Sequence, residues 1–264
     1  MTSQELVNQG RILIDRGQLA EAVNLLGRAV QLDAENKLAH WARGTALGRL
    51  GRLPEALACF DRALELDPGF PEAWSNKAIS LQGLGSLEEA ARCAERARQL
   101  APAEPSAWAI NADVLRALGR LPEALHCVER ALELAPISSE AWIIKAHVLT
   151  ASGDAPQAEA CYRKAVSFEP LAAQAWLALG EIHEKRGEAA AAVDCYARAA
   201  ANAPNEFATL YNLAVSLSRL REFERAMPLF ERAFPLAPKG HEALVEQARQ
   251  YVREYHAWKR ANRI

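Results

Sequence analysis

Cysteine and histidine are the side chains of this sequence that could support catalysis or metal binding. The five cysteines follow one another at a constant interval of 34 residues, as Cys59, Cys93, Cys127, Cys161 and Cys195. A metal needs its ligands within about 2.3 Å of one ion, and a disulfide needs Cα atoms less than about 7 Å apart. Equivalent positions of stacked helices lie about 8–10 Å apart. The series therefore predicts buried, reduced side chains and not a metal site, a redox row or disulfides.

The six histidines are scattered along the chain and complete no catalytic group. His126 precedes Cys127, but neighbouring residues of a helix point about 100° apart and cannot share a proton in that arrangement. The sequence holds neither a glycine-rich phosphate loop nor a His-Glu-x-x-His pattern. We therefore expect a protein that is not an enzyme, with no catalytic residues, no metal and no cofactor.

The interval of 34 residues also orders the rest of the chain. The turn glycine Gly85 has counterparts at Gly17, Gly51, Gly119, Gly153 and Gly187. Trp74 recurs as Trp108, Trp142 and Trp176. Ala90 recurs as Ala22, Ala56, Ala124, Ala158, Ala192 and Ala226. Such self-similarity indicates a solenoid of stacked helical repeats.

Each unit divides into two predicted helices around its glycine. In the 71–104 unit the first helix is expected over 72–84, because Trp74, Ala78 and Leu81 follow the i, i+4, i+7 spacing of one buried stripe. The second helix is expected to end near Leu100, because Pro102 forbids its continuation. Alanine favours helix and lets neighbouring helices approach closely.

Helix ends carry further predictions. The pairs Ser86 with Glu89 and Asp154 with Gln157 each have the spacing of a capping box. Arg221 stands where six units have glycine, which predicts a less sharp last turn.

Two departures concern positions on the core side of the first helices. His183 replaces a leucine, and we interpret it as a core histidine bonded to a neighbour, with a functional switch as the alternative. A polar row lies where leucine is common, at Arg43, Lys77, Asn111 and Lys145. Its long basic chains are expected to lead their charge to water, with a polar seam reaching the groove rim as the alternative.

These residues resemble the tetratricopeptide repeat family over positions 3–240. The resemblance implies an all-α fold, in which antiparallel helix pairs stack into a right-handed superhelix whose concave surface usually binds peptide segments. The expected units are 3–36, 37–70, 71–104, 105–138, 139–172, 173–206 and 207–240. A C-terminal capping helix over 241–264 is expected to cover the last apolar face, with Lys259, Arg260 and Arg263 at the negative end of its dipole.

The side of each first helix opposite its buried stripe is expected to face a shared peptide-binding groove. The predicted groove residues are Leu38, Trp41, Thr45, Arg49, Ser75, Asn76, Ile79, Ala109, Ile110, Asp113, Arg116, Ile143, Ile144, His147, Leu177, Glu181, Tyr211, Asn212, Val215 and Arg219. Many are apolar, and exposure of such a row is unfavourable unless something covers it.

We hypothesise that this row receives a partner segment with apolar anchors, while Asn76 and Asn212 bond its backbone. Trp41 is the expected principal anchor, because binding energy concentrates in buried aromatics. His40 stands where four later units have tryptophan, and the shift to Trp41 turns the indole by about 100° around its helix. The alternative is that curvature or the chain's own ends cover the row.

The charge and the hydropathy of the sequence limit the classes of binding partner that we expect. A net charge of −2 from 31 basic and 33 acidic residues gives no field for nucleic acid or an anionic membrane. The sequence has no run of about 18 apolar residues, so no direct membrane insertion is expected and a cytoplasmic location is the default. The lysine and asparagine that co-chaperones of this family use to hold acidic termini are absent, and the groove charges are mixed. Strong attraction for an acidic tail is therefore not expected.

The sequence thus predicts a non-catalytic scaffold or adaptor that binds a protein or peptide partner. A self-assembling structural scaffold, and hence a homo-oligomer, is one alternative. The other is a regulatory or targeting subunit of a larger enzyme complex.

Overall fold

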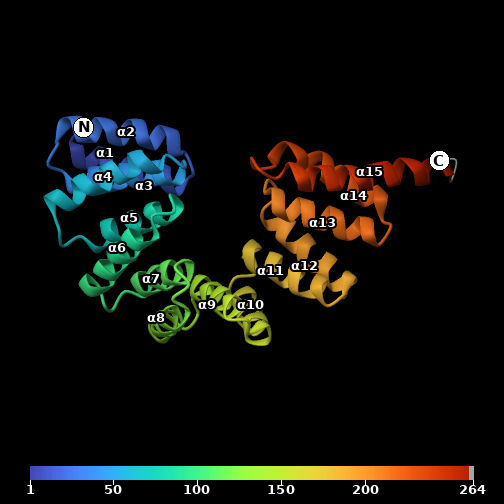
Figure 1. The fold of residues 1–264 in the computed structure, drawn as a ribbon. Coiled ribbons are helices and arrows are strands. Elements are labelled where there is room, and N and C mark those ends of the chain that lie inside the picture. Colours follow the sequence, from blue (N-terminus) through green and yellow to red (C-terminus); the bar gives the residue numbers. More distant parts are fainter. Residues whose placement is uncertain (262–264) are drawn as a thin grey trace. The chain divides into compact units, whose positions relative to one another are not determined.

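The computed structural model describes residues 1–261, and every regular element within them is helical. The first helices of the pairs are α1 (Ser3–Asp15), α3 (Lys37–Arg49), α5 (Pro71–Gly83), α7 (Pro105–Ala117), α9 (Ser139–Ala151), α11 (Ala173–Lys185) and α13 (Phe207–Arg219). The second helices are α2 (Leu19–Leu32), α4 (Leu53–Leu66), α6 (Leu87–Leu100), α8 (Leu121–Leu134), α10 (Ala155–Phe168), α12 (Ala189–Asn202) and α14 (Phe223–Ala233). The turn η1 (Phe234–Leu236) and α15 (Glu242–Ala261) follow (Figure 1). The predicted all-α fold of helix pairs is confirmed.

The chain divides into two compact units. The first unit comprises Met1–Ile137 with His147–Gly153, and the second comprises Ser138–Ala146 and the residues from Asp154 onward. Within the first unit, α2 packs against both α1 and α3, and the same order continues to α8. Within the second unit, α12 packs against α11 and α13. The seven unit boundaries and the right-handed superhelix stay predictions.

A left-handed residue joins the two helices of most pairs. Gly85 has a φ of +78°, and the amides of Gly85 and Ser86 donate to carbonyls of the preceding turn at 3.0 and 2.9 Å. Arg221 has a φ of 63°, and the equivalent two bonds to Ser218 and Leu217 are both 2.9 Å. The expectation of a less sharp last turn is therefore wrong. The turn thus places an arginine in a conformation that glycine adopts at lower cost.

The predicted helix caps differ from the observed ones. The carboxylate of Asp154 accepts from the backbone amide of Gln157 at 3.1 Å, while the Gln157 side chain donates to the same carboxylate. The Ser86 hydroxyl makes no capping bond with any described residue, so the box predicted there is wrong. A complete capping box occurs at α1, between Thr2 and Glu5.

Small side chains fill the contacts between helices. The alanines at the positions of Ala90 are at most 1% exposed. All five cysteines are buried and free, and burial raises the pKa of each thiol. They are therefore protonated and weakly nucleophilic at neutral pH. Within residues 1–261 no three histidine, cysteine or acidic side chains are grouped to hold a metal ion.

The last helix covers part of the second unit. α15 packs against α13 and α14, with Ala248 fully buried and Val245, Tyr251 and Val252 partly buried in the same cluster. No helix of the described chain is both long and apolar enough to cross a membrane. Positions 262–264 of the predicted capping helix, including Arg263, lie outside the described residues.

Candidate functional site

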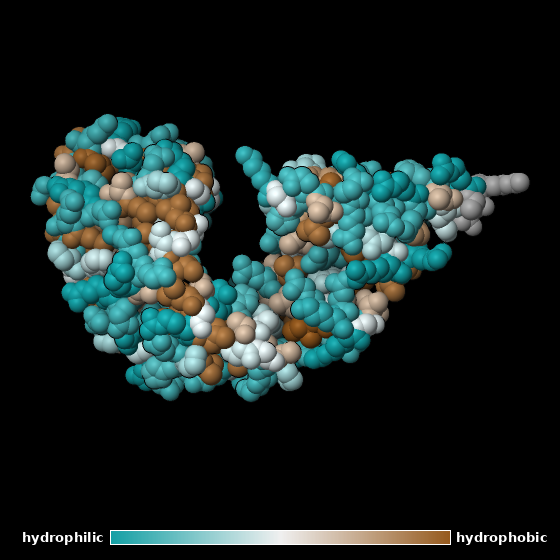
Figure 2. Space-filling view, viewed as in Figure 1, coloured by the Kyte–Doolittle hydropathy of each residue, from teal (hydrophilic) through white to brown (hydrophobic). Residues whose placement is uncertain are grey.

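The candidate site lies on the face of α1, α3, α5 and α7 that is turned away from their buried stripe, in the first unit. We call it the inner face. Apolar side chains gather there and elsewhere as patches among polar ones (Figure 2). Between α3 and α5 this face holds a pocket of about 290 Å³, lined by Thr45, Gly48, Arg49, Phe60, Asn76, Ile79 and Ser80. The fold thus brings four predicted site residues, Thr45, Arg49, Asn76 and Ile79, into one cavity.

Some polar groups of the pocket are hydrogen-bonded to each other or to nearby backbone. The Asn76 amide nitrogen donates to the Thr45 hydroxyl at 2.9 Å, and that hydroxyl donates to the Trp41 carbonyl at 3.0 Å. Arg49 donates to the Ile14 carbonyl at 3.3 Å, and no described carboxylate pairs with it. The Asn76 carbonyl oxygen and the Arg49 guanidinium therefore retain capacity for a ligand.

Tryptophans at the Trp74 position form a regular set of bonds to the loop that precedes their helix. In three of them the indole Nε1 donates to a proline carbonyl six residues earlier, at 2.9 Å for Trp74, 2.8 Å for Trp108 and 2.9 Å for Trp176. In the 37–70 unit His40 takes this place, with Nε2 3.0 Å from the carbonyl of Ala34. The bond that fixes the helix entrance is thus kept without a tryptophan.

Trp41 is consequently free of this structural task. Its ring is half-buried, with the ring of Phe70 at 5.7 Å and the guanidinium carbon of Arg11 at 5.8 Å from its centre. Its Nε1 is buried and has no hydrogen-bond partner among the described residues. A buried donor without a partner costs about 1–3 kcal/mol. Trp41 therefore combines partly exposed apolar area with an unused donor, one helical turn before Thr45 of the pocket.

The other predicted residues of the first unit differ in exposure. Ile79 is 48% exposed, whereas Ser75 and Ala109 are 9% and 5% exposed. For these two the expected exposure is wrong, because short side chains at the Trp41 position do not reach past their neighbours. Partly buried positions are Leu38, Ile110, Asp113, Arg116 and His147.

Charges at the α7 end of the inner face are satisfied internally. The Asp113 carboxylate accepts from Gln82 at 2.7 Å and pairs with Arg116 at 2.7 Å. Burial, followed by the charge of Arg116, lowers the pKa of His147. This end is therefore less available to a ligand than the pocket beside Arg49.

In the second unit, Tyr211 contradicts the expectation of an open anchor. Its hydroxyl donates to the Leu244 carbonyl of α15 at 3.2 Å, and its ring stacks on Phe207 at 5.2 Å. Only 7% of the residue is exposed, and Val215 on the same helix is 6% exposed. The chain's own last helix covers this part of the row, as the alternative interpretation held.

The remaining residues of the second unit do not form a described pocket. Ile144, which borders the buried stripe and joins the core, is 8% exposed, so its expected exposure is wrong. The other predicted positions are half-buried or exposed, at Ile143, Leu177, Glu181, Asn212 and Arg219. Arg219 pairs with Glu184. His183 lies 2.5 Å from Glu188 through Nδ1, as expected for a histidine bonded to a neighbour.

Phe60, at the floor of the pocket, was not predicted. The signal for it is Gly44, which lies inside α3 and precedes Phe60 by 16 residues. A Cβ atom at Gly44 would lie 2.6 Å from the Phe60 ring. The glycine thus makes room for the aromatic ring, and Gly180 stands in the same relation to Tyr196.

Comparison with known proteins places this architecture in a described family. The family model of the tetratricopeptide repeat matches residues 7–71, 75–138, 111–169, 145–207 and 186–241. No curated protein matches the chain significantly.

Solved structures share the fold. A tetratricopeptide repeat protein from Parabacteroides merdae aligns with a TM-score of 0.69 and 19% identity over 92% of this chain and 97% of its own. A thermophilic protein of the same kind from Thermus thermophilus gives 0.64 and 24% over 69% and 98%. The APC/C hetero-tetramer Cut9–Hcn1 gives 0.70 and 14% over 82% and 43%. At these identities the likeness shows the fold.

Proposed function

Because the chain belongs to the tetratricopeptide repeat family, we propose that it is a non-catalytic scaffold that binds a peptide segment of a partner protein on the inner face. The observation that carries the proposal is the position of Trp41. Its indole lies one position later on the helix than the other tryptophans, and its Nε1 is unbonded. Its backbone carbonyl accepts from Thr45, which lines the pocket with Arg49, Asn76 and Ile79. The indole also packs against the core, but this packing leaves its Nε1 without a hydrogen-bond partner among the described residues.

The pocket defines what kind of segment fits. Ile79 and the Trp41 ring offer apolar surface to one buried side chain of the partner. The Asn76 carbonyl accepts from a backbone amide, and Arg49 donates to a backbone carbonyl. When the indole turns toward an acceptor of the partner, the cost of its unbonded donor is recovered. We therefore propose that the ligand is a short peptide segment with one apolar anchor side chain and a backbone that is hydrogen-bonded to the inner face.

Peptides selected from a random library against the whole chain test the proposal. Their dissociation constants are then measured by fluorescence anisotropy for the wild type, Trp41→Ala and Ile79→Asp. We expect each variant to bind at least about tenfold more weakly, which corresponds to about 1.4 kcal/mol. The control is Ile137→Asp, because Ile137 is 73% exposed and lies outside the pocket. Equal binding by wild type and both pocket variants contradicts the proposal.

A further inference from the structure

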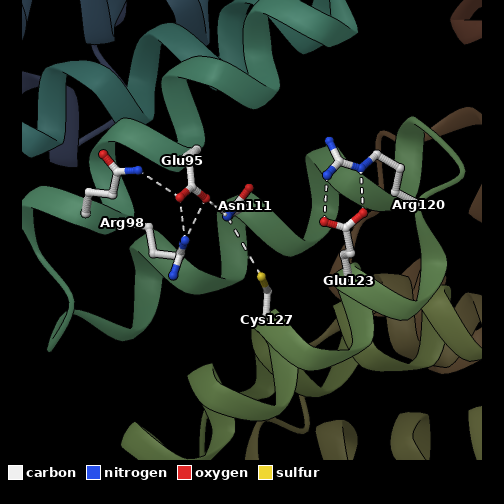
Figure 3. A network of polar contacts seen from close by, with 7 residues as sticks. Glu95, Arg98, Asn111, Arg120, Glu123 and Cys127 are labelled. Atoms are coloured by element: carbon white, nitrogen blue, oxygen red, sulfur yellow. Dashed lines mark hydrogen bonds and ion pairs between the residues drawn. The ribbon is translucent and has the colours of Figure 1, made fainter.

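A larger cleft lies in the first unit where α6, α7 and α8 meet. Its volume is about 990 Å³. Glu95 on α6, Asn111 of α7 and Glu123 on α8 line it (Figure 3). Glu88 and Arg92 of α6 also belong to its lining. We call it the outer cleft. None of its lining residues belongs to the pocket of the inner face.

The preceding seam, between α4, α5 and α6, shows what these carboxylate positions can hold. There Lys77 of α5 places its Nζ 2.6 Å from Asp61 and 3.9 Å from Glu89. Its side chain is only 16% exposed. Lys77 thus carries its charge to carboxylates of the second helices, while the alternative of a polar seam reaching the groove rim stays a prediction. An ammonium group lies between two carboxylates from neighbouring second helices.

The outer cleft has carboxylates at the positions equivalent to Asp61 and Glu89, but no ammonium at the position equivalent to Lys77. Glu95 and Glu123 follow Asp61 and Glu89 by 34 residues, but Asn111 replaces Lys77. Asparagine is too short to reach between them, so the space that the aminoalkyl chain fills in the preceding seam stays open. The sequence interval and the observed cleft agree on this point.

Asn111 also presents an unused acceptor. It is 3% exposed, and its amide nitrogen donates to Glu95 at 3.2 Å and lies 3.8 Å from the Cys127 sulfur. Its carbonyl oxygen accepts no hydrogen bond from the described residues. A buried amide with one free lone-pair site therefore lines the cleft, where it suits a donor such as ammonium.

Arginines at present neutralise both carboxylates. Glu95 pairs with Arg98 at 2.5 Å, and Glu123 pairs with Arg120 at 2.6 Å. Each pair joins residues three positions apart and is partly or largely exposed to solvent, so its loss costs little. Arg98 also lies 4.5 Å from the centre of the Trp108 ring, a contact that does not involve Glu95. The carboxylates can therefore exchange partners.

We propose that the outer cleft binds a lysine side chain of a partner protein, with the ammonium in the place that Lys77 Nζ occupies in the preceding seam. Glu95, Glu123 and the Asn111 carbonyl accept its three protons, and Leu115 and Leu118 of the lining contact its alkyl chain. The volume exceeds that of one alkylammonium and leaves room for the flanking peptide backbone.

Four probes test the chemistry, each titrated into the whole chain while the Asn111 side-chain amide is followed by NMR. They are acetyl-Gly-Lys-Gly-amide, the same peptide with norleucine or glutamate in place of lysine, and cadaverine. We expect saturable shifts with the lysine peptide and at least about tenfold weaker binding of the norleucine peptide. Tighter binding of the glutamate peptide overturns the proposal. Cadaverine that binds as tightly as the lysine peptide overturns the assignment to a protein partner.

Two variants exchange the residue types at the equivalent positions 77 and 111 of the two seams. Asn111→Lys supplies the ammonium from the chain itself, at the position equivalent to Lys77, and should abolish binding of the lysine peptide. Lys77→Asn should open an equivalent cleft between Asp61 and Glu89 and raise the stoichiometry from one to two. Glu133→Gln is the control, because Glu133 pairs with Arg130 on α8 outside the cleft. Thermal melts confirm folding, and unchanged binding by folded Asn111→Lys contradicts the proposal.

Discussion

The Nε2 atom of His40 lies 3.0 Å from the carbonyl oxygen of Ala34 and replaces the indole bond made at the same place in later units. One histidine thus performs the structural role of a tryptophan. The indole that follows it, Trp41, packs against Phe70 and Arg11 and keeps an unbonded Nε1. Stability and binding therefore depend on different residues at this helix entrance.

The double variant His40→Trp with Trp41→Ala separates these two roles. It restores the tryptophan of the other units but removes the half-buried indole of Trp41, so we expect the free energy of unfolding to fall by about 1–3 kcal/mol in a protein that still folds. Peptide affinity at the inner face should fall at least about tenfold, because the anchor is gone. Urea denaturation and fluorescence anisotropy measure the two effects. Full affinity in a folded double variant would show that Trp41 is not the anchor.

The unpartnered side chain of Arg43 leads us to predict that a substitution at Gly27 stabilises the protein. Lys77 pairs with Asp61, but the position equivalent to Asp61 in the first repeat is Gly27. The Nε of Arg43 is buried without a partner, and a Cβ at Gly27 would lie 3.9 Å from it. Gly27→Glu should therefore raise the free energy of unfolding by about 1–2 kcal/mol, from helix propensity and a new charge-assisted bond.

A double-mutant cycle distinguishes the two contributions at Gly27. Gly27→Ala measures the gain in propensity alone, about 1 kcal/mol. Adding Arg43→Met to both proteins isolates the interaction of the introduced carboxylate with Arg43, which we expect to be about 1 kcal/mol and weaker in high salt. A coupling energy of zero would mean that this carboxylate does not reach the guanidinium.

Arg221 predicts a second stabilising substitution. Its φ of 63° is left-handed, a region that costs a residue with a Cβ roughly 1–2 kcal/mol. Glycine loses more entropy on folding, by about 0.5–1 kcal/mol. Arg221→Gly should therefore stabilise the second unit by about 0.5–1 kcal/mol in chemical denaturation. In contrast, Arg225→Gly in the helical part of α14 should destabilise it by about 1 kcal/mol. The same sign for both variants would contradict the prediction.

His147 predicts a pH dependence of stability. Burial and the charge of Arg116 lower its folded-state pKa below the ordinary 6.5, against the smaller opposite effect of Asp113. The unfolded chain therefore binds the proton first as the pH falls. Its contribution to stability is present above pH 6.5 and declines as the pH falls through 6.5 toward the folded-state pKa.

Urea denaturation between about pH 8 and pH 5 measures this decline. His147→Gln removes the titrating ring, so its stability should fall less steeply than that of the wild type in this range. The other histidines are present in both proteins and cancel in the comparison. Parallel stability curves would show that His147 does not titrate differently on folding.

Much of the fold follows from local patterns, whereas exposure does not. The interval of 34 residues predicts where the helices lie. The shift of Trp41 is visible in the sequence because His40 occupies the position of the later tryptophans. In contrast, the burial of Tyr211 depends on α15, whose Leu244 lies 33 residues later. A helical wheel has no information about such a distant cover.

The outer cleft shows a second limit. The row of Arg43, Lys77 and Asn111 was recognisable in the sequence, but its partners lie on other helices. The carboxylates of Asp61 and Glu95 become relevant only when the helices are packed side by side. Interpreting one helix at a time therefore separates charges that the fold brings together.

The regular series of buried thiols allows local opening of the chain to be measured from the alkylation rate of each cysteine. One cysteine lies in each pair from α3/α4 to α11/α12, and each is between 4% and 8% exposed. An alkylating reagent can reach such a sulfur efficiently only when its surroundings come apart. The five labelling rates, resolved by mass spectrometry, would give a profile of breathing motions along the stack without any introduced dye.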